Sequence, residues 1–323
     1  MAFDNKVLTR ALARYDADKT ERRLRFERER EEIFAKLPHV RELDQKIRKA
    51  VIAAAAAAIR RKGELKQQID AIASENLELQ EELAAELERG GYSPRALDEL
   101  PDCEICGDRG FMRGSMCECL KSVYRDEQLK VLGESLNTTI CRFDNFDLSL
   151  YPASSRAIME RVVQLCKEYA GSFTLRSRNL YLYGGPGLGK TFISGCIAGA
   201  VTEIGYSVVY TTAVKLCETL EKSKFARNSV TDEQDDAVQR FFASDLLILD
   251  DLGTEMRTQF TISAIYDVIN TRIASALPTI ITSNYAPNQL GAAYSPQIES
   301  RLSYEYIPCP FAGEDIRKVK RGR

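Results

Sequence analysis

A glycine-rich run, GGPGLGKT, lies between the apolar stretch NLYLY and the stretch FISGCIAGAVTEI. It follows the pattern G-x-x-x-x-G-K-T, and its place between a predicted strand and a predicted helix is typical of nucleotide-binding loops. Glycines let backbone N–H groups turn toward phosphates, and the start of the helix adds positive potential. We expect Lys190 to contact the β- and γ-phosphates and Thr191 to bind Mg²⁺. The loop consists of Gly184, Gly185, Pro186, Gly187, Leu188, Gly189, Lys190 and Thr191.

Two further apolar runs, LLILDD and TIITSN, end in side chains that suit a metal and a phosphate. Asp250 could bind Mg²⁺, often through water, and Asp251 could orient or deprotonate the attacking water. The alternative for this pair is a cap of the next helix. The amide of Asn284 could contact the γ-phosphate or the water, although alone it would be an ordinary turn residue.

Two arginines late in the sequence could complete such a site. Arg301, in ESRL, could stabilise charge on the transferring phosphoryl group from across a subunit boundary, which requires an oligomer. In a monomer it could pair with Glu299 or a helix C-terminus instead. Arg317 could sense phosphate from the C-terminal side, and a solvated basic tail accounts for it equally well. Because 22 residues follow Arg301, we expect no separate helical lid domain over the nucleotide.

Four of the nine cysteines are clustered in CEICGDRGFMRGSMCECL. A C-x-x-C pair and a C-x-C pair on two tight turns can place four thiolates around a tetrahedral Zn²⁺, and a closed four-sulfur site is structural. A reduced, metal-free knuckle is the alternative. The other five cysteines stand in apolar contexts and are expected to pack as small hydrophobic residues. The predicted zinc ligands are Cys103, Cys106, Cys117 and Cys119.

These residues must be positioned by the strands and helices around them. From about residue 179 onward, short apolar runs alternate with helix-like segments, which predicts a parallel sheet covered by helices on both faces. Ligands of such a sheet bind at the C-terminal ends of its strands. The predicted strands are NLYLY, SVVYTT, DLLILD, PTIITS and YEYIPC.

The first 90 residues are rich in Arg, Lys, Glu, Leu and Ala and predict two long helices that break near Leu37–Pro38. In the second helix, spacings of four and three residues predict a coiled-coil seam with Asn76 at a core position, where an Asn can fix register. A helix packed on its own domain is the alternative. Either arrangement favours contact with a partner protein. The seam residues are Leu65, Ile69, Ile72, Asn76, Leu79 and Leu83.

The composition of the 323 residues is that of an ordinary globular protein, with a formal net charge of −2. A protein with this net charge has no overall positive potential that would attract nucleic acid or a membrane surface. The longest aliphatic run, VIAAAAAAI, is far shorter than the roughly 20 residues that span a bilayer. We therefore expect a cytoplasmic protein without membrane contact. The single histidine, His39, is expected on the surface, which argues against histidine-based acid–base chemistry.

The set GGPGLGKT, LLILDDLG, TIITSN and ESRL, in this order, resembles the AAA+ ATPases. Within them the chain is similar to the replicative helicase loaders of the DnaC/DnaI type and the related IstB-type transposition ATPases. Three features narrow the resemblance from AAA+ ATPases in general to these two groups. They are the Asp-Asp pair, the short C-terminus and the cysteine knuckle joined to RFDNFDLSLYP. It implies a five-stranded parallel sheet sandwiched by helices. The predicted segments are a helical arm (1–92), a knuckle (101–122), a linker with the start of the ATPase (123–177) and the ATPase domain (178–323).

The resemblance also implies roles for single residues. Asn284 would be sensor 1, Arg301 the finger that reaches a neighbouring subunit, and Arg317 sensor 2. ATP and Mg²⁺ would act as an assembly and release switch, with slow, partner-stimulated hydrolysis, for a loader of the hexameric replicative helicase. Transposition ATPases and a non-hydrolysing scaffold are the alternatives. Basic residues of the segment after the second strand would contact single-stranded DNA near Phe225, namely Lys215, Lys222, Lys224 and Arg227.

Overall fold

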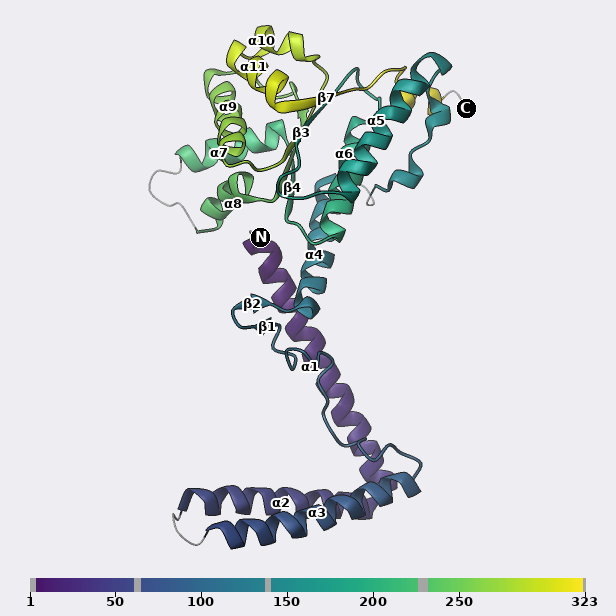
Figure 1. The fold of residues 1–323 in the computed structure, drawn as a ribbon, viewed down its shortest axis with the longest axis vertical. Coiled ribbons are helices and arrows are strands. Elements are labelled where there is room, and N and C mark those ends of the chain that lie inside the picture. The colour runs from purple at the N-terminus through teal and green to yellow at the C-terminus, as the bar shows by residue number, and fades with distance from the viewer. Residues whose placement is uncertain (1–3, 61–64, 137–140, 226–231, 322–323) are drawn as a thin grey trace. The chain divides into compact units, whose positions relative to one another are not determined.

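The computed structural model describes residues 4–60, 65–136, 141–225 and 232–321, which fall into two compact units. Unit 1 contains Met1–Ala13 and Glu118–Arg323, and unit 2 contains Arg14–Cys117. Figure 1 labels the elements of both units along the chain. The division into two units does not test the boundaries of the four predicted segments, which stay a prediction.

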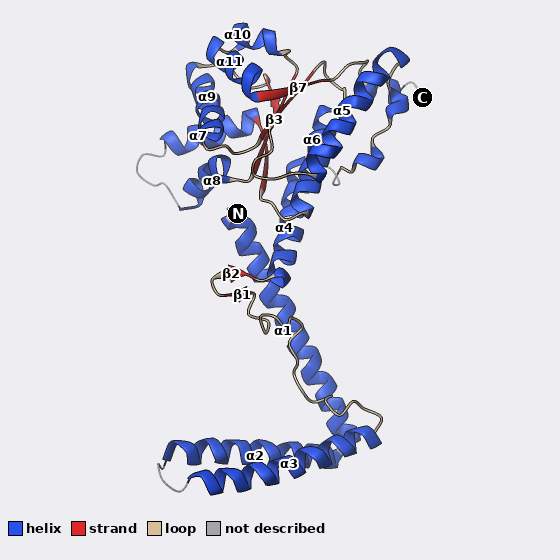
Figure 2. Cartoon of the chain, in the orientation of Figure 1, coloured by secondary structure: helices blue, strands red, loops and turns tan. Residues whose placement is uncertain are grey.

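Unit 1 is built on a sheet of five parallel strands in the order β4-β5-β6-β3-β7. All five predicted strands are present, and Figure 2 shows them between helices on both sides. The strands are β3 (Asn179–Tyr183), β4 (Val208–Thr212), β5 (Leu246–Leu252), β6 (Thr279–Ser283) and β7 (Tyr306–Pro310). The chain therefore has the predicted α/β fold, a five-stranded parallel sheet flanked by helices.

Alternate residues of each strand enter two separate cores. Leu180 and Leu182 of β3 pack in the core under α4, α5 and α6, while Tyr181 packs in the core under α7, α8, α9 and α11. This period of two explains why the strands are apolar on both faces. The long helices of this unit are α4 (Glu118–Leu136), α5 (Ala153–Gly171), α6 (Lys190–Glu203), α7 (Ala213–Phe225), α8 (Asp232–Ala243), α9 (Gln259–Ala274) and α11 (Pro296–Glu305). The short helices are η1 (Phe143–Asn145), η2 (Leu148–Leu150), η3 (Pro287–Gln289), α10 (Leu290–Ala293) and α12 (Ile316–Arg321).

The helical arm contains three helices rather than the predicted two. They are α1 (Asn5–Lys36), which begins in unit 1, α2 (Pro38–Arg60) and α3 (Leu65–Arg89). The break before Pro38 lies where we expected it. The second predicted helix corresponds to two described helices, α2, which ends at Arg60, and α3, which begins at Leu65.

Helix α3 packs against α2 of the same chain. Near the base of this pair, Leu83 and Leu87 pack with Ile33, Phe34 and Val40 in a small core. The amide oxygen of Asn76 is buried without a hydrogen-bond partner among the described residues. The side chains of the first three seam residues, Leu65, Ile69 and Ile72, lie outside the described part of the structure. The contacts that are described thus join helices of one chain.

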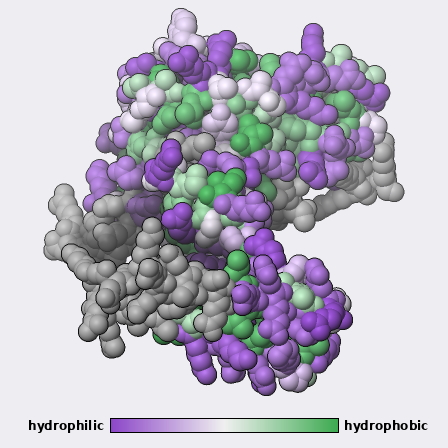
Figure 3. Space-filling view, turned by 60° about the horizontal axis from the view of Figure 1, so that its bottom comes forward, coloured by the Kyte–Doolittle hydropathy of each residue, from purple (hydrophilic) through white to green (hydrophobic). Residues whose placement is uncertain are grey.

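The surface of the protein is mixed in character. On the face drawn in Figure 3, hydrophilic residues lie between smaller hydrophobic areas. None of the helices described is both long enough and apolar enough to cross a membrane.

Candidate nucleotide-binding site

The glycine-rich loop turns from the end of β3 at Tyr183 into the start of α6 at Lys190. Gly184 and Gly187 adopt φ angles of 145° and 70°, a region in which other residues are strained. A Cβ at Gly184 would lie 2.3 Å from the carbonyl oxygen of Phe311, and one at Gly187 would lie 1.8 Å from Oδ1 of Asp315. Both the turn and the close approach of the segment after β7 therefore require glycine here.

Lys190 begins α6, and its side chain turns back into the loop, so that only 5% of the residue is exposed. Its Nζ donates hydrogen bonds to the carbonyl oxygens of Gly184 (2.7 Å) and Gly185 (2.8 Å) and to Oδ1 of Asn284 (2.9 Å). Burial lowers the pKa of Lys190, and the two aspartates of β5, Asp251 and Asp250, act in the opposite direction. Lys190 and Asn284, both predicted for the site, are thus joined by a hydrogen bond.

Asp250 lies at the end of β5 and is 3% exposed. Its Oδ1 accepts hydrogen bonds from Oγ1 of Thr282 (2.6 Å) and from Oγ1 of Thr191 (3.3 Å). Burial raises the pKa of Asp250, and the hydrogen bond from Thr282 opposes that rise. The geometry therefore joins the two predicted magnesium ligands directly.

The same oxygen atoms suit Mg²⁺. In octahedral coordination at about 2.1 Å, neighbouring ligand oxygens lie about 3 Å apart, and the oxygens of Thr191 and Asp250 are 3.3 Å apart. The Thr191 hydroxyl and the Asp250 carboxylate would hold the ion, directly or through water. The bound ion would neutralise charge on the phosphates.

Asp251 stands in a distorted part of the strand. The pairing of β5 with β6 shifts register between Leu249 and Leu252, and Asp251 adopts a φ of 55°. Its N–H donates to Oγ1 of Thr282 (2.9 Å), and its carbonyl oxygen accepts from Oγ1 of Thr254 (2.8 Å). The bulge turns Asp251 toward the cavity next to the loop, which it lines together with Thr254. Thr282, which our sequence analysis overlooked, therefore holds both aspartates.

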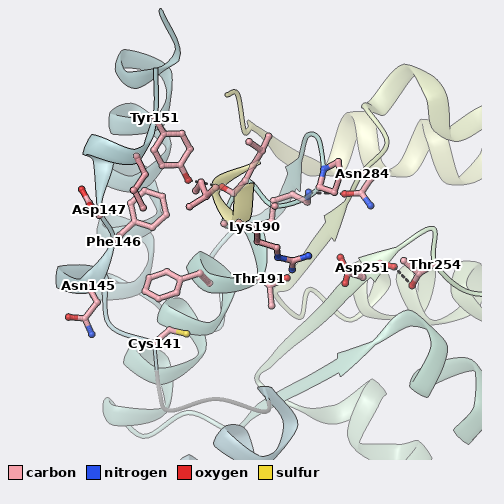
Figure 4. A pocket seen from close by; sticks show the side chains of 18 residues that line it. Cys141, Asn145, Phe146, Asp147, Tyr151, Lys190, Thr191, Asp251, Thr254 and Asn284 are labelled. Atoms are coloured by element: carbon pink, nitrogen blue, oxygen red, sulfur yellow. Dashed lines mark hydrogen bonds between the residues drawn. The ribbon is translucent and has the colours of Figure 1, made fainter. Parts of the chain in front are cut away.

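A cavity of about 530 Å³ lies beside the glycine-rich loop, within the usual volume range of small-molecule sites. Figure 4 shows Cys141, Asn145, Phe146 and Tyr151 on one side of the cavity. On the other side of Lys190 and Thr191 lie Asp251, Thr254 and Asn284. The first side, which carries the rings of Phe146 and Tyr151, is called the aromatic wall below, and the opposite side is polar.

The aromatic wall comes from the segment just before α5, to which the sequence analysis assigned no role. The ring of Phe146 lies 5.6 Å from that of Tyr151 and 5.9 Å from that of Phe192, between ring centroids. The hydroxyl of Tyr151 donates to the carbonyl oxygen of Leu188 (2.7 Å). In the sequence, the feature that could have indicated this wall is the run RFDNFDLSLYP, which contains three aromatic residues. It ends at Pro152, 32 residues before Gly184.

The two candidate arginines occupy different places. Arg317 lines the cavity beside Ile316, whose N–H donates to the carbonyl oxygen of Gly187 (3.1 Å). Arg301, on α11, lines a separate groove with Tyr266 and Tyr304 and does not line this cavity. Within the described residues it forms no ion pair, with Glu299 or any other acid. The site of one chain is therefore built without Arg301.

The residues that form this site lie within a recognised family segment. The sequence model described as "IstB-like ATP binding protein" matches residues 142–297, which include the aromatic wall, the glycine-rich loop, both aspartates and Asn284. Residues 142–297 are thus similar to IstB-like ATP-binding proteins.

Several named proteins are similar to this domain and its surroundings. The replicative helicase loader DnaI of Bacillus subtilis is 29% identical over 173 residues, which are 53% of this chain and 50% of the relative. The loader DnaC of Buchnera aphidicola is 25% identical over 45% of this chain and 55% of the relative. The insertion sequence IS21 putative ATP-binding protein of Pseudomonas aeruginosa is 26% identical over 55% of this chain and 65% of the relative. The chain thus spans about half the length of the two loaders.

Solved structures give similar neighbours. The crystal structure of DnaI has a TM-score of 0.44 at 20% identity, with 55% of this chain and 93% of that chain covered. The crystal structure of the DnaC helicase loader has a TM-score of 0.46 at 20% identity, with 53% and 97% covered.

The cysteine cluster lies outside the IstB-like domain. Its loop contains the two-stranded hairpin of β1 (Phe111–Met112) and β2 (Ser115–Met116). Asp108 closes the first turn by accepting from the N–H groups of Asp102 (3.2 Å) and Cys103 (3.0 Å). The sulfur atoms all lie within 4.8 Å of one another, in the set Cys103, Cys106, Cys117 and Cys119.

These distances fit a zinc ion. Four sulfurs at about 2.3 Å from a tetrahedral centre lie about 3.8 Å apart, and the sulfurs of Cys103 and Cys117 are 3.7 Å apart. All four residues would be ligands, so the ion would have no open position and would stabilise the knuckle.

Proposed function

We propose that the IstB-like domain binds ATP with Mg²⁺ and hydrolyses it. The observation that supports this most strongly is the presence of two hydrogen-bonded pairs at one cavity, Lys190 with Asn284 and Thr191 with Asp250. Of these four residues, all but Asp250 line the cavity. Lys190 would bind the β- and γ-phosphates in place of its present backbone acceptors. Asp251 would orient or deprotonate the attacking water, and Asn284 would fix the γ-phosphate or that water.

The aromatic wall would hold the base of the nucleotide. The faces of Phe146 and Tyr151 offer apolar surface of the right kind, and Asn145 and Asp147 offer polar groups at its edge. Arg317 would contact phosphate from the segment after β7.

We further propose that the chain is an ATP-dependent loader of the hexameric replicative helicase, acting in the cytoplasm. This is supported by the similarity to two proteins named as replicative helicase loaders and by the presence of a long helical arm. The arm and the zinc knuckle would contact the helicase. ATP would favour an assembled state, and hydrolysis would release it, because a γ-phosphate shifts only equilibria whose two states it contacts differently.

Arg301 would complete the site of a neighbouring subunit. It lies in a groove apart from the nucleotide cavity of its own chain, which is what a contribution in trans requires. Charge on the transferring phosphoryl group would then be stabilised only in an oligomer.

Single-stranded DNA contact is proposed for α7. Lys215, Lys222 and Lys224 are exposed on this helix, and the ammonium of Lys224 lies 4.9 Å from the ring centroid of Phe260. Exposed lysines can neutralise phosphates without reading sequence. The side chain of Phe225 and the whole of Arg227, which belong to the same prediction, lie outside the described residues.

A transposition role is the second candidate, because the matching family model is named after IstB and an IS21 protein matches 55% of this chain. ATP turnover with single-stranded DNA and the host's replicative helicase, with size-exclusion chromatography in parallel, distinguishes the two. A loader shows stimulated turnover and co-elutes with the helicase. Indifference to the helicase, together with stimulation by a transposase and duplex DNA, would favour the second candidate.

Subunit mixing tests the trans contribution of Arg301. Arg301→Ala should lower partner-stimulated turnover by at least about a hundredfold, whereas the exposed Arg176→Ala should not change it. Lys190→Ala should be inactive alone. Mixing Lys190→Ala with Arg301→Ala should restore part of the turnover, because one chain supplies the nucleotide site and the other the arginine. A mixture as inactive as its components would refute the shared site.

A further inference from the structure

The loop between β5 and α9 contains a buried carboxylate that the proposed chemistry does not use. Glu255 is 6% exposed and lies four residues after Asp251. Its Oε2 accepts a hydrogen bond from the N–H of Gly253 (3.0 Å), and its Oε1 accepts one from the hydroxyl of Tyr294. Burying a carboxylate is costly unless it is well hydrogen-bonded, so these two hydrogen bonds stabilise Glu255 in its buried position.

On one side, Glu255 fixes the backbone that borders the nucleotide cavity. The Gly253 N–H that it accepts belongs to the turn between Asp251 and Thr254, both of which line the cavity. Gly253 has a φ of 113°, and a Cβ there would lie 2.5 Å from the ring of Tyr285. The turn therefore requires glycine next to Tyr285, and Glu255 is hydrogen-bonded to its backbone.

On the other side, Tyr294 stands at the joint between α10 and α11. It is the C-cap of α10, and the next residue, Ser295, is the N-cap of α11, where its side chain accepts from the N–H of Ile298. Burial raises the pKa of Tyr294, which keeps its hydroxyl a donor. Arg301 lies on this same helix, two turns after the joint.

A second contact joins the same two segments. Nη1 of Arg257 donates to the carbonyl oxygen of Ala293 (3.4 Å), the residue before Tyr294. The loop after β5 is thus hydrogen-bonded twice to Ala293 and Tyr294, which lie just before α11. These two contacts connect the edge of the nucleotide cavity to the helix that carries Arg301.

We propose that Glu255 and Tyr294 are positioning residues that couple the nucleotide site of a chain to the placement of its own Arg301. A displacement of Asp251 and Thr254 when the nucleotide changes would move the Gly253 turn, Glu255 and then the start of α11. The occupancy of one site would thereby control the arginine offered to the next subunit. The inference rests on the proposed contribution of Arg301 in trans.

Tyr294→Phe removes one hydroxyl and keeps the ring, so it tests the link with little change in packing. The mixture for this test pairs Asp251→Asn with Arg301→Ala, because Asp251→Asn should keep nucleotide affinity and lose turnover, so the site of the arginine-supplying chain can still be occupied. Tyr294→Phe can be placed in either chain. Placed in the Asp251→Asn chain, which supplies the arginine and can still bind nucleotide, it should lower the restored turnover about tenfold. Placed in the Arg301→Ala chain, which supplies the nucleotide site, it should leave turnover within about twofold. Glu255→Gln should show the same asymmetry.

A purely structural role predicts the opposite pattern, because a loosened Gly253 turn would harm the chain that supplies the nucleotide site. Equal loss in both arrangements, or loss only in the site-supplying chain, would overturn the coupling. Tyr169→Phe is the matched control, since the hydroxyl of Tyr169 is buried without a hydrogen-bond partner among the described residues. If the parent mixture recovers no turnover, the trans contribution itself has failed; if it recovers and both placements of Tyr294→Phe are silent, only the coupling has failed.

Discussion

The two hydrogen bonds of Thr282 predict a specific effect of Thr282→Val, which removes the hydroxyl and keeps the branched shape. Thr282 is fully buried, so water cannot replace the donor to Asp250 or the acceptor for the Asp251 N–H. A hydrogen bond to a carboxylate contributes about 1.5–3 kcal/mol and a neutral one about 0.5–1.5 kcal/mol. We expect the free energy of unfolding to fall by about 2–4 kcal/mol, measured by urea unfolding.

The same substitution should change the pH dependence of Mg²⁺–nucleotide binding. The pKa of Asp250 is raised by burial, and the hydrogen bond from Thr282 opposes that rise. Without the hydroxyl the pKa rises further, so protons compete with Mg²⁺ at a higher pH. The acid side of the binding curve, measured with a fluorescent ATP analogue, should therefore move to higher pH in Thr282→Val.

Thr282→Ser is the matched control, because it retains the hydroxyl. It should keep the wild-type pH dependence and lose only the stability that its missing methyl group contributes. An unfolding free energy within about 0.5 kcal/mol of wild type in Thr282→Val, or an acid side that does not move, would refute this account of the two aspartates.

Further predictions concern the loop, the second aspartate and the knuckle. Asp251→Asn should leave nucleotide affinity within about threefold and lower turnover by about 10²–10⁴-fold, measured by binding and phosphate release; equal losses in both would contradict its role. Gly187→Ala should weaken nucleotide binding and cost about 1–3 kcal/mol in unfolding, because its Cβ would meet Asp315; Asp315→Ala in the same chain should recover part of this, and no recovery would argue against the clash. Cys106→Ser should abolish the binding of one Zn²⁺ per chain, measured by metal analysis, and leave nucleotide affinity unchanged; a metal-free wild type would contradict the site.

Without metal, the raised pKa of Asp250 also has a consequence for stability. A carboxyl whose pKa is higher in the folded state stabilises the fold while it is protonated, and this contribution is lost as pH rises through the folded value. At higher pH the ionised carboxylate of Asp250 therefore lowers the free energy of unfolding. A cation bound by the oxygens of Thr191 and Asp250 would offset this loss.

The sheet and the polar side of the cavity followed from sequence because both depend on local pattern. Each strand is a short apolar run, and parallel strands bring their C-terminal ends to one edge. Lys190, Asp250 and Asn284 follow three of those runs. Lys190 is hydrogen-bonded to Asn284, and Asp250 is hydrogen-bonded to Thr191, the residue after Lys190.

What escaped sequence analysis depends on contacts between distant segments. Thr282 belongs to an apolar strand, and only the register of β5 against β6 reveals that its hydroxyl meets two aspartates. Phe146 and Tyr151 reach the loop only because the segment before α5 folds back onto α6. The contact between Glu255 and Tyr294 joins residues 39 positions apart. In the arm, the heptad spacing begins at Leu65, and the division into α2 and α3 went unpredicted.

The central claim is that ATP at this site acts as a switch for loading, and it can be tested by a loading assay on closed circular single-stranded DNA. The host's replicative helicase is incubated with the circle, ATP and either wild-type protein or Lys190→Ala, and DNA-bound helicase is measured over time. We predict that the wild type loads the helicase and that Lys190→Ala, folded as judged by circular dichroism, does not. Loading by Lys190→Ala at the wild-type rate would contradict the account.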